Sequence, residues 1–124
     1  MKTVSVVIPC YNEEGNVEPL VQELDKLVLL NADLNFQVLI VDNASVDSTQ
    51  SLVMDLRTVR PWLGFITLAR NCGTEGAMLA GLDHIDGDCV VFLNADLEDP
   101  PELISTFLQH WKDGLIKINV INMF

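Results

Sequence analysis

VSVVIPCYNEEGNV, residues 4–17, is the stretch that decides the fold. Its first part, Val4–Ile8, is a short β-branched run that ends at Pro9, which is typical of a strand buried on both faces. The following residues predict a helix from Glu14 to Leu30, because apolar side chains recur on one face at helical spacing. These positions are Val17, Leu20, Val21, Leu24, Leu27 and Val28. The stretch is therefore the first β-α unit of an α/β domain.

The rest of the chain repeats this alternation. Further strands are predicted at 36–41, 64–68 and 89–93. Further helices are predicted from Asp47 to before Pro61, from Thr74 to near Gly87, and from Asp99 to about Lys112. Asp47, Thr74 and Asp99 are the expected caps, with Gln50 completing a capping box and Pro100 in the first helical position. Regular alternation with apolar strands predicts an α/β fold with a mostly parallel sheet and helices on both faces.

The composition of the chain argues against some classes of binding partner. The chain has 124 residues and a net charge of −11, which argues against nucleic acid and against an anionic membrane surface. An acidic protein still binds an anionic nucleotide when a divalent cation neutralises the charge between them. No signal peptide and no membrane span is predicted, so a cytoplasmic location is expected. The odd number of cysteines, Cys10, Cys72 and Cys89, predicts reduced thiols packed as small hydrophobic residues.

Polar residues collect after every predicted strand. They are Asn12, Glu13 and Glu14, then Asp42, Asn43, Ser45 and Asp47, then Arg70, Asn71 and Gly73, then Asn94, Asp96, Glu98 and Asp99. In an open α/β sheet such loops meet at one edge, where ligands bind. Some of these residues are helix caps, but Asp42 and Asp96 stand at strand ends, where a half-buried carboxylate needs a partner. No GxGxxG, GxxxxGK[ST] or GxSxG sequence is present, so other nucleotide or hydrolase sites fit less well.

Four segments in order resemble family 2 glycosyltransferases: VSVVIPCYNEEGNV, VDNASVDST, LARNCGTEGAMLAGLDHIDGD and VVFLNADLEDPPELI. They are most similar to the polyprenyl-phosphate group, which includes dolichol-phosphate mannose synthases and bactoprenol glucosyltransferases. The resemblance implies a GT-A, Rossmann-like fold truncated at the C-terminus. Residues 1–114 would then form the nucleotide-sugar-binding half, and residues 115–124 an atypical tail. The implied reaction transfers a hexose from a UDP- or GDP-sugar to polyprenyl phosphate with inversion.

The same resemblance implies which residues bind the nucleotide sugar. They are Pro9, Asn12, Glu14, Asp42, Asp47, Arg70, Asn71, Asn94 and Asp96. Asp42 corresponds to the carboxylate that reads the base or ribose. Asn94 and Asp96 lie where the family has its Asp-x-Asp motif, whose last acid helps to hold Mg²⁺ or Mn²⁺ on the diphosphate. Catalytic residues are expected in the part of the family domain that follows.

Three departures from the family pattern bear on function. Asn94 keeps an oxygen ligand but lacks the charge of the usual acid, so weaker metal binding is expected. The loop Asp42-Asn43-Ala44-Ser45 lacks the usual second Asp and Gly, and Ala44 tolerates a left-handed backbone less well than Asn43 does. Family members also continue beyond this length, and that part supplies the acceptor site and, in this group, amphipathic or transmembrane helices, so full-length relatives are expected at the cytoplasmic face of a membrane. The apolar C-terminal end is therefore a candidate edge for self-association.

Two alternatives to an active transferase remain at this point. The chain could be a catalytically inactive remnant that binds the nucleotide only, which donor binding without turnover would reveal. It could also be a receiver-like signalling domain with Asp42 as the phosphoacceptor. A receiver needs an acidic pair after the first strand, which Glu13 and Glu14 only loosely supply, and a late Lys, for which there is no good candidate.

Overall fold

The computed structural model describes residues 1–96, 101–114 and 120–122 as alternating strands and helices. The elements are β1 Thr3–Cys10, α1 Glu14–Leu30, β2 Asn35–Asp42, α2 Thr49–Arg57, β3 Leu63–Thr67, α3 Gly73–Leu82, β4 Cys89–Phe92, α4 Pro101–Lys112 and β5 Val120–Asn122. The predicted order of strands and helices is confirmed. Strand β5 lies within residues 115–124, the segment that the sequence marks as an atypical tail.

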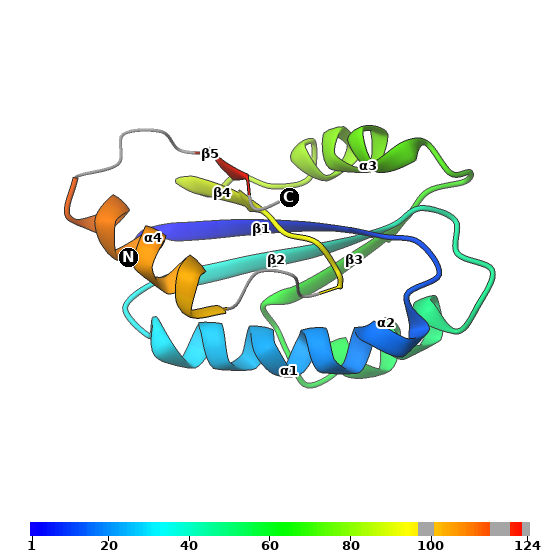
Figure 1. The fold of residues 1–124 in the computed structure, drawn as a ribbon, viewed down its shortest axis with the longest axis horizontal. Coiled ribbons are helices and arrows are strands. Elements are labelled where there is room, and N and C mark those ends of the chain that lie inside the picture. The colour runs from blue at the N-terminus through cyan, green and yellow to red at the C-terminus, as the bar shows by residue number, and fades with distance from the viewer. Residues whose placement is uncertain (97–100, 115–119, 123–124) are drawn as a thin grey trace.

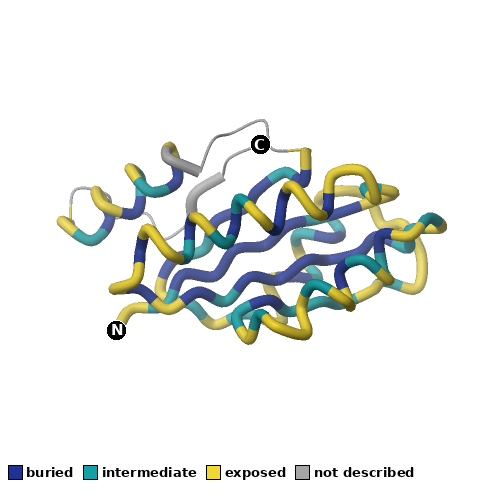
Figure 2. Tube along the Cα trace, turned by 90° about the horizontal axis from the view of Figure 1, so that it is seen from below, coloured by how far each residue is buried: buried dark blue, intermediate teal, exposed yellow. Residues whose placement is uncertain are grey.

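The strands form one parallel sheet in the order β3-β2-β1-β4-β5. Strand β1 is central, and its Val6 lies opposite Val38 of β2 on one side and Val91 of β4 on the other. All three of these side chains are at most 1% exposed, as the dark central strands of Figure 2 illustrate. A strand with neighbours on both sides and helices above and below has no solvated face. The apolar run Val4–Ile8 is the consequence of that position.

Helices cover both faces of the sheet, as predicted. Figure 1 shows α3 on one side and α1 and α2 on the other. Alternate side chains of β1 separate accordingly: Val6 and Ile8 belong to the core shared with α1 and α4, whereas Val7 packs in the smaller core beneath α3. The polar loops therefore project from the carboxyl edge of a sheet that is packed on both sides.

Two of the predicted helix starts differ from the structure. Helix α3 begins at Gly73, so the predicted cap Thr74 is wrong. The Gly73 backbone N–H instead donates to the Asn71 side-chain oxygen at 2.8 Å. The predicted caps Asp99 and Pro100 lie outside the described residues.

The predicted capping box of α2 is also wrong in part. Asp47 does accept a hydrogen bond from the Thr49 N–H at 3.0 Å, in the first turn of the helix. Gln50, however, donates its amide to Asp42 at 2.8 Å. A tertiary contact at the end of β2 therefore takes the side chain that local spacing had assigned to the helix.

Gly81 lies where α3 packs tightly against β1 and β2. A Cβ atom at this position would lie 2.5 Å from Val7 Cγ1 and 3.2 Å from Val41 Cγ2. We expect Gly81→Val to lower the free energy of unfolding by about 1–3 kcal/mol, the usual effect of overpacking a well-packed core. Urea unfolding followed by circular dichroism measures this change.

Gly15→Val is the matched control for that substitution, because Gly15 also lies in a helix but has no atom within 4 Å of its Cβ position. Its effect should stay within about 0.5 kcal/mol, as for other surface substitutions. Equal losses in both variants would show that the close approach of α3 is not a packing constraint.

None of the helices in the described part of the chain combines the length and the apolar character that crossing a membrane requires. The predicted domain boundary after residue 114 and the self-association through the C-terminal edge stay predictions.

Candidate functional site

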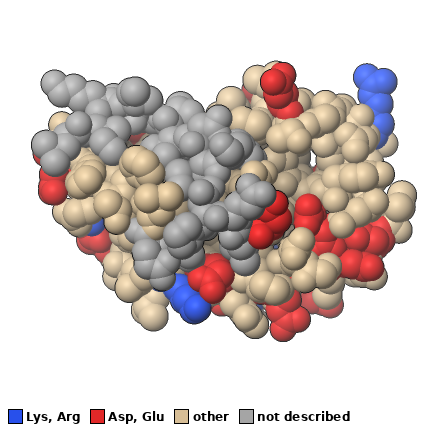
Figure 3. All heavy atoms as spheres, in the orientation of Figure 1, with Lys and Arg blue, Asp and Glu red and all other residues tan. Residues whose placement is uncertain are grey.

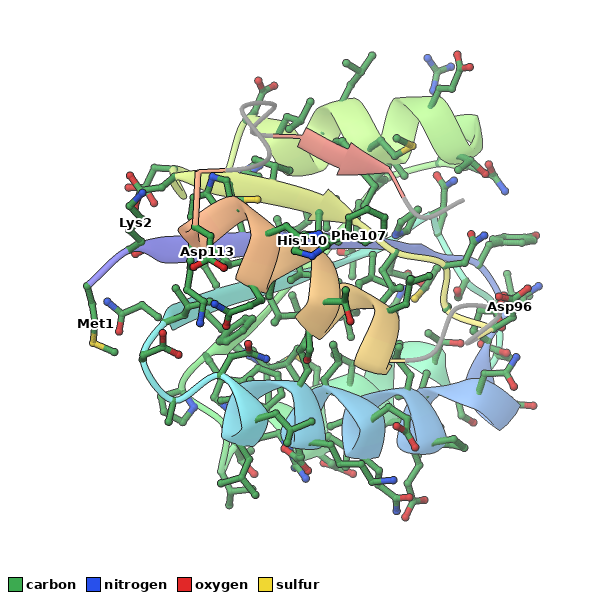
Figure 4. The ribbon with its side chains drawn as sticks, turned by 60° about the vertical axis from the view of Figure 1, so that its left-hand side comes forward. Met1, Lys2, Asp96, Phe107, His110 and Asp113 are labelled. Atoms are coloured by element: carbon green, nitrogen blue, oxygen red, sulfur yellow. The ribbon has the colours of Figure 1, made fainter. Side chains whose placement is uncertain are left out.

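A small polar pocket lies where β1 and β4 end. Its volume is about 140 Å³, and it is lined by Pro9, Cys10, Tyr11, Glu13, Asn43, Thr74, Asn94, Ala95 and Asp96. Figure 3 shows acidic side chains gathered at this end of the molecule, over the loops that follow β1 and β2. Figure 4 shows Asp96 at the same end, opposite the end that carries Lys2 and Asp113. The fold therefore brings Pro9, Asn94 and Asp96, three of the predicted site residues, to one pocket.

Three other predicted residues join two loops to each other. Asn12 accepts a hydrogen bond from the Val46 N–H at 2.9 Å, and Glu14 accepts one from the Ser48 N–H at 2.9 Å. In the opposite direction, the Glu14 N–H donates to Asp47 at 3.3 Å. None of these three predicted side chains lines the pocket. They hold the loop after β1 against the loop after β2, so the rim of the pocket is built before any ligand binds.

The hydrogen bonds of these two loops also affect the pKa of the Asp47 carboxyl. Desolvation raises the pKa of its carboxyl, but hydrogen bonds from the Thr49 hydroxyl and N–H and from the Glu14 N–H outweigh it, so that the pKa lies below the usual 3.8. A group with a lowered pKa in the folded state contributes stability that is fully present above its unfolded pKa. That contribution is lost as the pH falls through the lower, folded-state value. The loop contact is therefore intact at neutral pH.

Asp42 is fully buried beneath the loop that it starts. One carboxylate oxygen, Oδ2, accepts hydrogen bonds from the Ser45 N–H at 3.1 Å and from the Gln50 amide at 2.8 Å. The other oxygen, Oδ1, is buried and has no hydrogen-bond partner in the described part of the chain. A buried acceptor without a partner costs about 1–3 kcal/mol. Asp42 thus holds the loop with one oxygen, while the other stays buried without a donor among the described residues.

The left-handed residue of this loop is Ala44, with φ of +66°, and not Asn43. Outside glycine this conformation is unfavourable by about 1–2 kcal/mol. The next residue explains why it persists, because the Ser45 N–H reaches Asp42 only across this turn. Asn12 is also left-handed, with φ of +52°, and is held by the same pair of loops. Local strain at both positions is thus offset by contacts between the loops.

Arg70 and Asn71 occupy the loop before α3, and both are exposed. Neither side chain lines the pocket, although the residues after them lead to Thr74, which does. Asn43 holds this loop: its Oδ1 accepts from the Cys72 N–H at 2.8 Å, and its Nδ2 donates to the Gly73 carbonyl at 3.0 Å. The sequence placed Asn43 among the polar loop residues and marked it as a departure from the family pattern, without assigning it a role. Its position directly after a buried strand was the signal that it could be structural.

All three cysteines are free, and they differ in whether they are buried or exposed. Cys10 and Cys89 are buried, as predicted, whereas Cys72 is exposed and the prediction is wrong for it. Burial raises the pKa of the Cys89 thiol to about 11. Burial, with the nearby charges of Glu13 and Asp42, also raises the pKa of Cys10. Cys10 therefore lines the pocket as a neutral thiol and offers no thiolate to a metal or an electrophile.

Oxygen atoms dominate the polar lining of the pocket. Asp96 contributes a carboxylate and Asn94 an amide oxygen, and Glu13 lies in the same lining. In the described residues, no group of three or more His, Cys, Asp or Glu side chains could hold a metal ion by itself. This set suits a hard cation such as Mg²⁺ or Mn²⁺ that keeps part of its shell as water or phosphate oxygen. It does not suit a structural zinc site.

The family model for glycosyl transferase family 2 matches residues 5–122 of the chain. Among curated relatives, the bactoprenol glucosyl transferase of Shigella phage SfX is 32% identical over 114 residues, which is 90% of this chain and 36% of that protein. The chain spans about a third of the length of the curated relatives it matches.

Two solved structures are similar to the chain. TarS 1-349 from S. aureus, in complex with UDP-GlcNAc, superposes with a TM-score of 0.75 at 27% identity, over 91% of this chain and 32% of that one. The mannosyltransferase PcManGT from Pyrobaculum calidifontis, in complex with GDP-Man and Mn²⁺, superposes with a TM-score of 0.67 at 29% identity, over 75% and 27%. Both agree with the GT-A type of fold that the sequence predicts.

Proposed function

Since the chain belongs to glycosyl transferase family 2, we propose that it forms the donor-binding part of an enzyme that transfers a hexose from a nucleotide-diphosphate sugar. The observation that carries this proposal is the polar pocket at the carboxyl edge of the sheet, to which Pro9, Asn94 and Asp96 converge. Ligands of open α/β sheets bind at this edge. The same family membership excludes the receiver-like signalling domain.

The pocket would take the diphosphate rather than the whole donor. Its volume of about 140 Å³ is well below the roughly 300–1,000 Å³ of sites that enclose a complete small molecule. The nucleoside would then extend across the joined loops that carry Asn12, Glu14 and Asp47. Asp42 is fully buried, so its Oδ1 oxygen would accept a hydrogen bond from the base or ribose after the loop over it shifts. Arg70 and Asn71, on the loop before α3, would lie at the phosphate side.

A divalent cation is proposed as the cofactor, Mg²⁺ or Mn²⁺, with Asp96 and Asn94 as its protein ligands. When bound, it would act as a Lewis acid that stabilises the charge developing on the leaving diphosphate. Support comes from the carboxylate and amide side chains in the pocket lining and from the Mn²⁺ in the mannosyltransferase structure. Without the cation, the carboxylates of Asp96 and Glu13 would repel the diphosphate, so nucleotide binding should require the metal.

Polyprenyl phosphate is proposed as the acceptor, on the strength of the similarity to a bactoprenol glucosyl transferase. A phosphate monoester is already ionised at neutral pH, so direct displacement at the anomeric carbon, with inversion, places little demand on a general base. Such an enzyme would work in the cytoplasm or on the cytoplasmic face of a membrane. The base, UDP or GDP, is left to experiment, since the two solved relatives carry one of each.

Isothermal titration of the chain with UDP and with GDP, each with and without Mn²⁺, tests the proposal. We expect one nucleotide to bind only when Mn²⁺ is present, with a dissociation constant of roughly 1 µM to 1 mM, the usual range for enzyme substrates. The nucleotide that binds identifies the base. Absence of heat with either nucleotide, from protein whose circular dichroism spectrum shows helix and strand, would reject the donor site.

A transfer assay then separates an enzyme from a remnant. Labelled nucleotide sugar and polyprenyl phosphate in detergent are incubated with the chain, and the lipid phase is counted. Labelled lipid shows transfer. Nucleotide binding without labelled lipid shows a donor-binding module that needs further residues for catalysis.

A further inference from the structure

Asn43 is a buried amide at the junction of three segments. Its side chain is 4% exposed, and it follows directly after β2. Its backbone N–H donates to the Cys10 carbonyl at the end of β1, at 2.8 Å. Its side chain accepts from the Cys72 N–H and donates to the Gly73 carbonyl. One residue thus connects the ends of two strands to the start of α3.

The side-chain contact needs an amide. Asn43 donates and accepts at once, which the planar amide of Asn or Gln allows at this short reach from the backbone. A carboxylate of the same shape would lose the donor for the Gly73 carbonyl and place two acceptor oxygens against each other, which would push the loop away and weaken the Cys72 contact as well. It would also add a negative charge beside Glu13 and Asp96, which line the same pocket. The amide is therefore favoured by both hydrogen bonding and charge.

The backbone that Asn43 holds leads directly to the pocket. Gly73 is the first residue of α3, and the next residue, Thr74, lines the pocket together with Asn43 itself. Gly73 has φ of +75° and makes a second contact, from its N–H to Asn71. The position of Thr74 relative to Asn94 and Asp96 is thus fixed through this amide.

We propose that Asn43 is a positioning residue of the donor site, whose amide holds the Arg70–Gly73 loop and the start of α3 in the geometry that binds the nucleotide diphosphate. This inference rests on the proposed function and goes beyond it by assigning a role to a residue that touches the loop rather than the ligand. It follows that the hydrogen-bond donor of the Asn43 side chain, and not only the size of that side chain, determines how tightly the nucleotide binds.

The test uses Asn43→Asp with two measurements on the chain. The first is the hydrogen-exchange protection factor of the Cys72 amide without ligand. The second is the dissociation constant for the nucleotide that binds with Mn²⁺. We expect the protection factor and the affinity each to fall about tenfold at neutral pH, the effect of losing roughly one well-placed hydrogen bond.

A pH series adds a signature that a merely structural role lacks. Protonation of the introduced carboxyl restores a donor, so the Cys72 protection factor should recover as the pH is lowered from about 8 to about 5.5, because burial and the neighbouring carboxylates raise the pKa of such a group. Those neighbours are Asp42 on β2, Glu13 on the loop after β1 and Asp96 after β4. The wild-type protection factor should stay level over the same range.

Asn31→Asp is the matched control. Asn31 is likewise a buried amide, 5% exposed, and it donates to the Leu27 carbonyl and to Ser105 far from the pocket. It should lower the free energy of unfolding and leave the Cys72 protection factor and the nucleotide affinity unchanged.

Three outcomes would overturn the positioning role. Wild-type protection of Cys72 in Asn43→Asp would show that the amide does not hold the loop. Lost protection with unchanged affinity would show a held loop that does not position the site. If the wild-type chain bound no nucleotide, the proposed function and the positioning role would both be rejected, and the protection factor would still report whether the loop contact exists.

Discussion

Asp96→Ala is expected to reduce Mn²⁺-dependent nucleotide affinity by at least about tenfold to a hundredfold, which is the loss caused by removing a group that merely orients a metal ligand. The reason is the donor set of the pocket, in which Asp96 and Glu13 are the carboxylates and the other oxygens are uncharged. A divalent cation held by one or two carboxylates depends strongly on each of them. Isothermal titration with the nucleotide, at fixed Mn²⁺, measures the change.

Asp55→Ala is the control for that substitution, because Asp55 is an exposed acid of α2 and its removal changes the net charge equally. It should leave the affinity unchanged. Asn94→Asp tests the opposite change. It adds a carboxylate to the pocket, so the nucleotide affinity should reach its maximum at a lower Mn²⁺ concentration. Equal losses of nucleotide affinity in Asp96→Ala and Asp55→Ala would be explained by the change in net charge. Unchanged affinity in both would likewise show that Asp96 is not a metal ligand.

The sheet was predictable because burial on two faces leaves a mark in the sequence. A run such as Val4–Ile8 has no polar alternation, and only a central parallel strand needs that composition. Strand β1 is that strand, with β2 and β4 on either side. The strand ends were also predictable, since Asp42 and Asn94 stop the apolar runs, and the parallel order then places the polar loops at one edge.

The roles of the individual loop residues were not predictable in the same way. Asn12 and Glu14 bond to backbone groups more than thirty positions away, and Gln50 leaves its helix start for Asp42. Such contacts depend on how two loops approach each other, which no local spacing encodes. The resemblance marked Asn12 and Glu14 as ligand-binding because they recur in a motif. The structure assigns part of that motif to holding the loops together.

Leu24→Ala is expected to lower the free energy of unfolding by about 2–5 kcal/mol, the range for removing a buried leucine side chain. Leu24 lies in the middle of α1, is 2% exposed and belongs to the core between this helix and the sheet. The loss combines the transfer of apolar atoms out of the core with the cavity that remains. Against the roughly 5–15 kcal/mol of a typical domain, it is a large part of the total stability.

Leu29→Ala in the same helix is the matched control, because it removes the same atoms from a side chain that is 79% exposed. It should change the free energy of unfolding by no more than about 0.5 kcal/mol. Urea unfolding of both variants, analysed with a common slope, gives the difference directly. The helical spacing placed Leu24 on the apolar stripe and left Leu29 off it, so the two variants test the sequence pattern as well as the packing. Similar losses would mean that α1 is not docked on the sheet by this face, and the loops that it anchors at Glu14 would then lack their support.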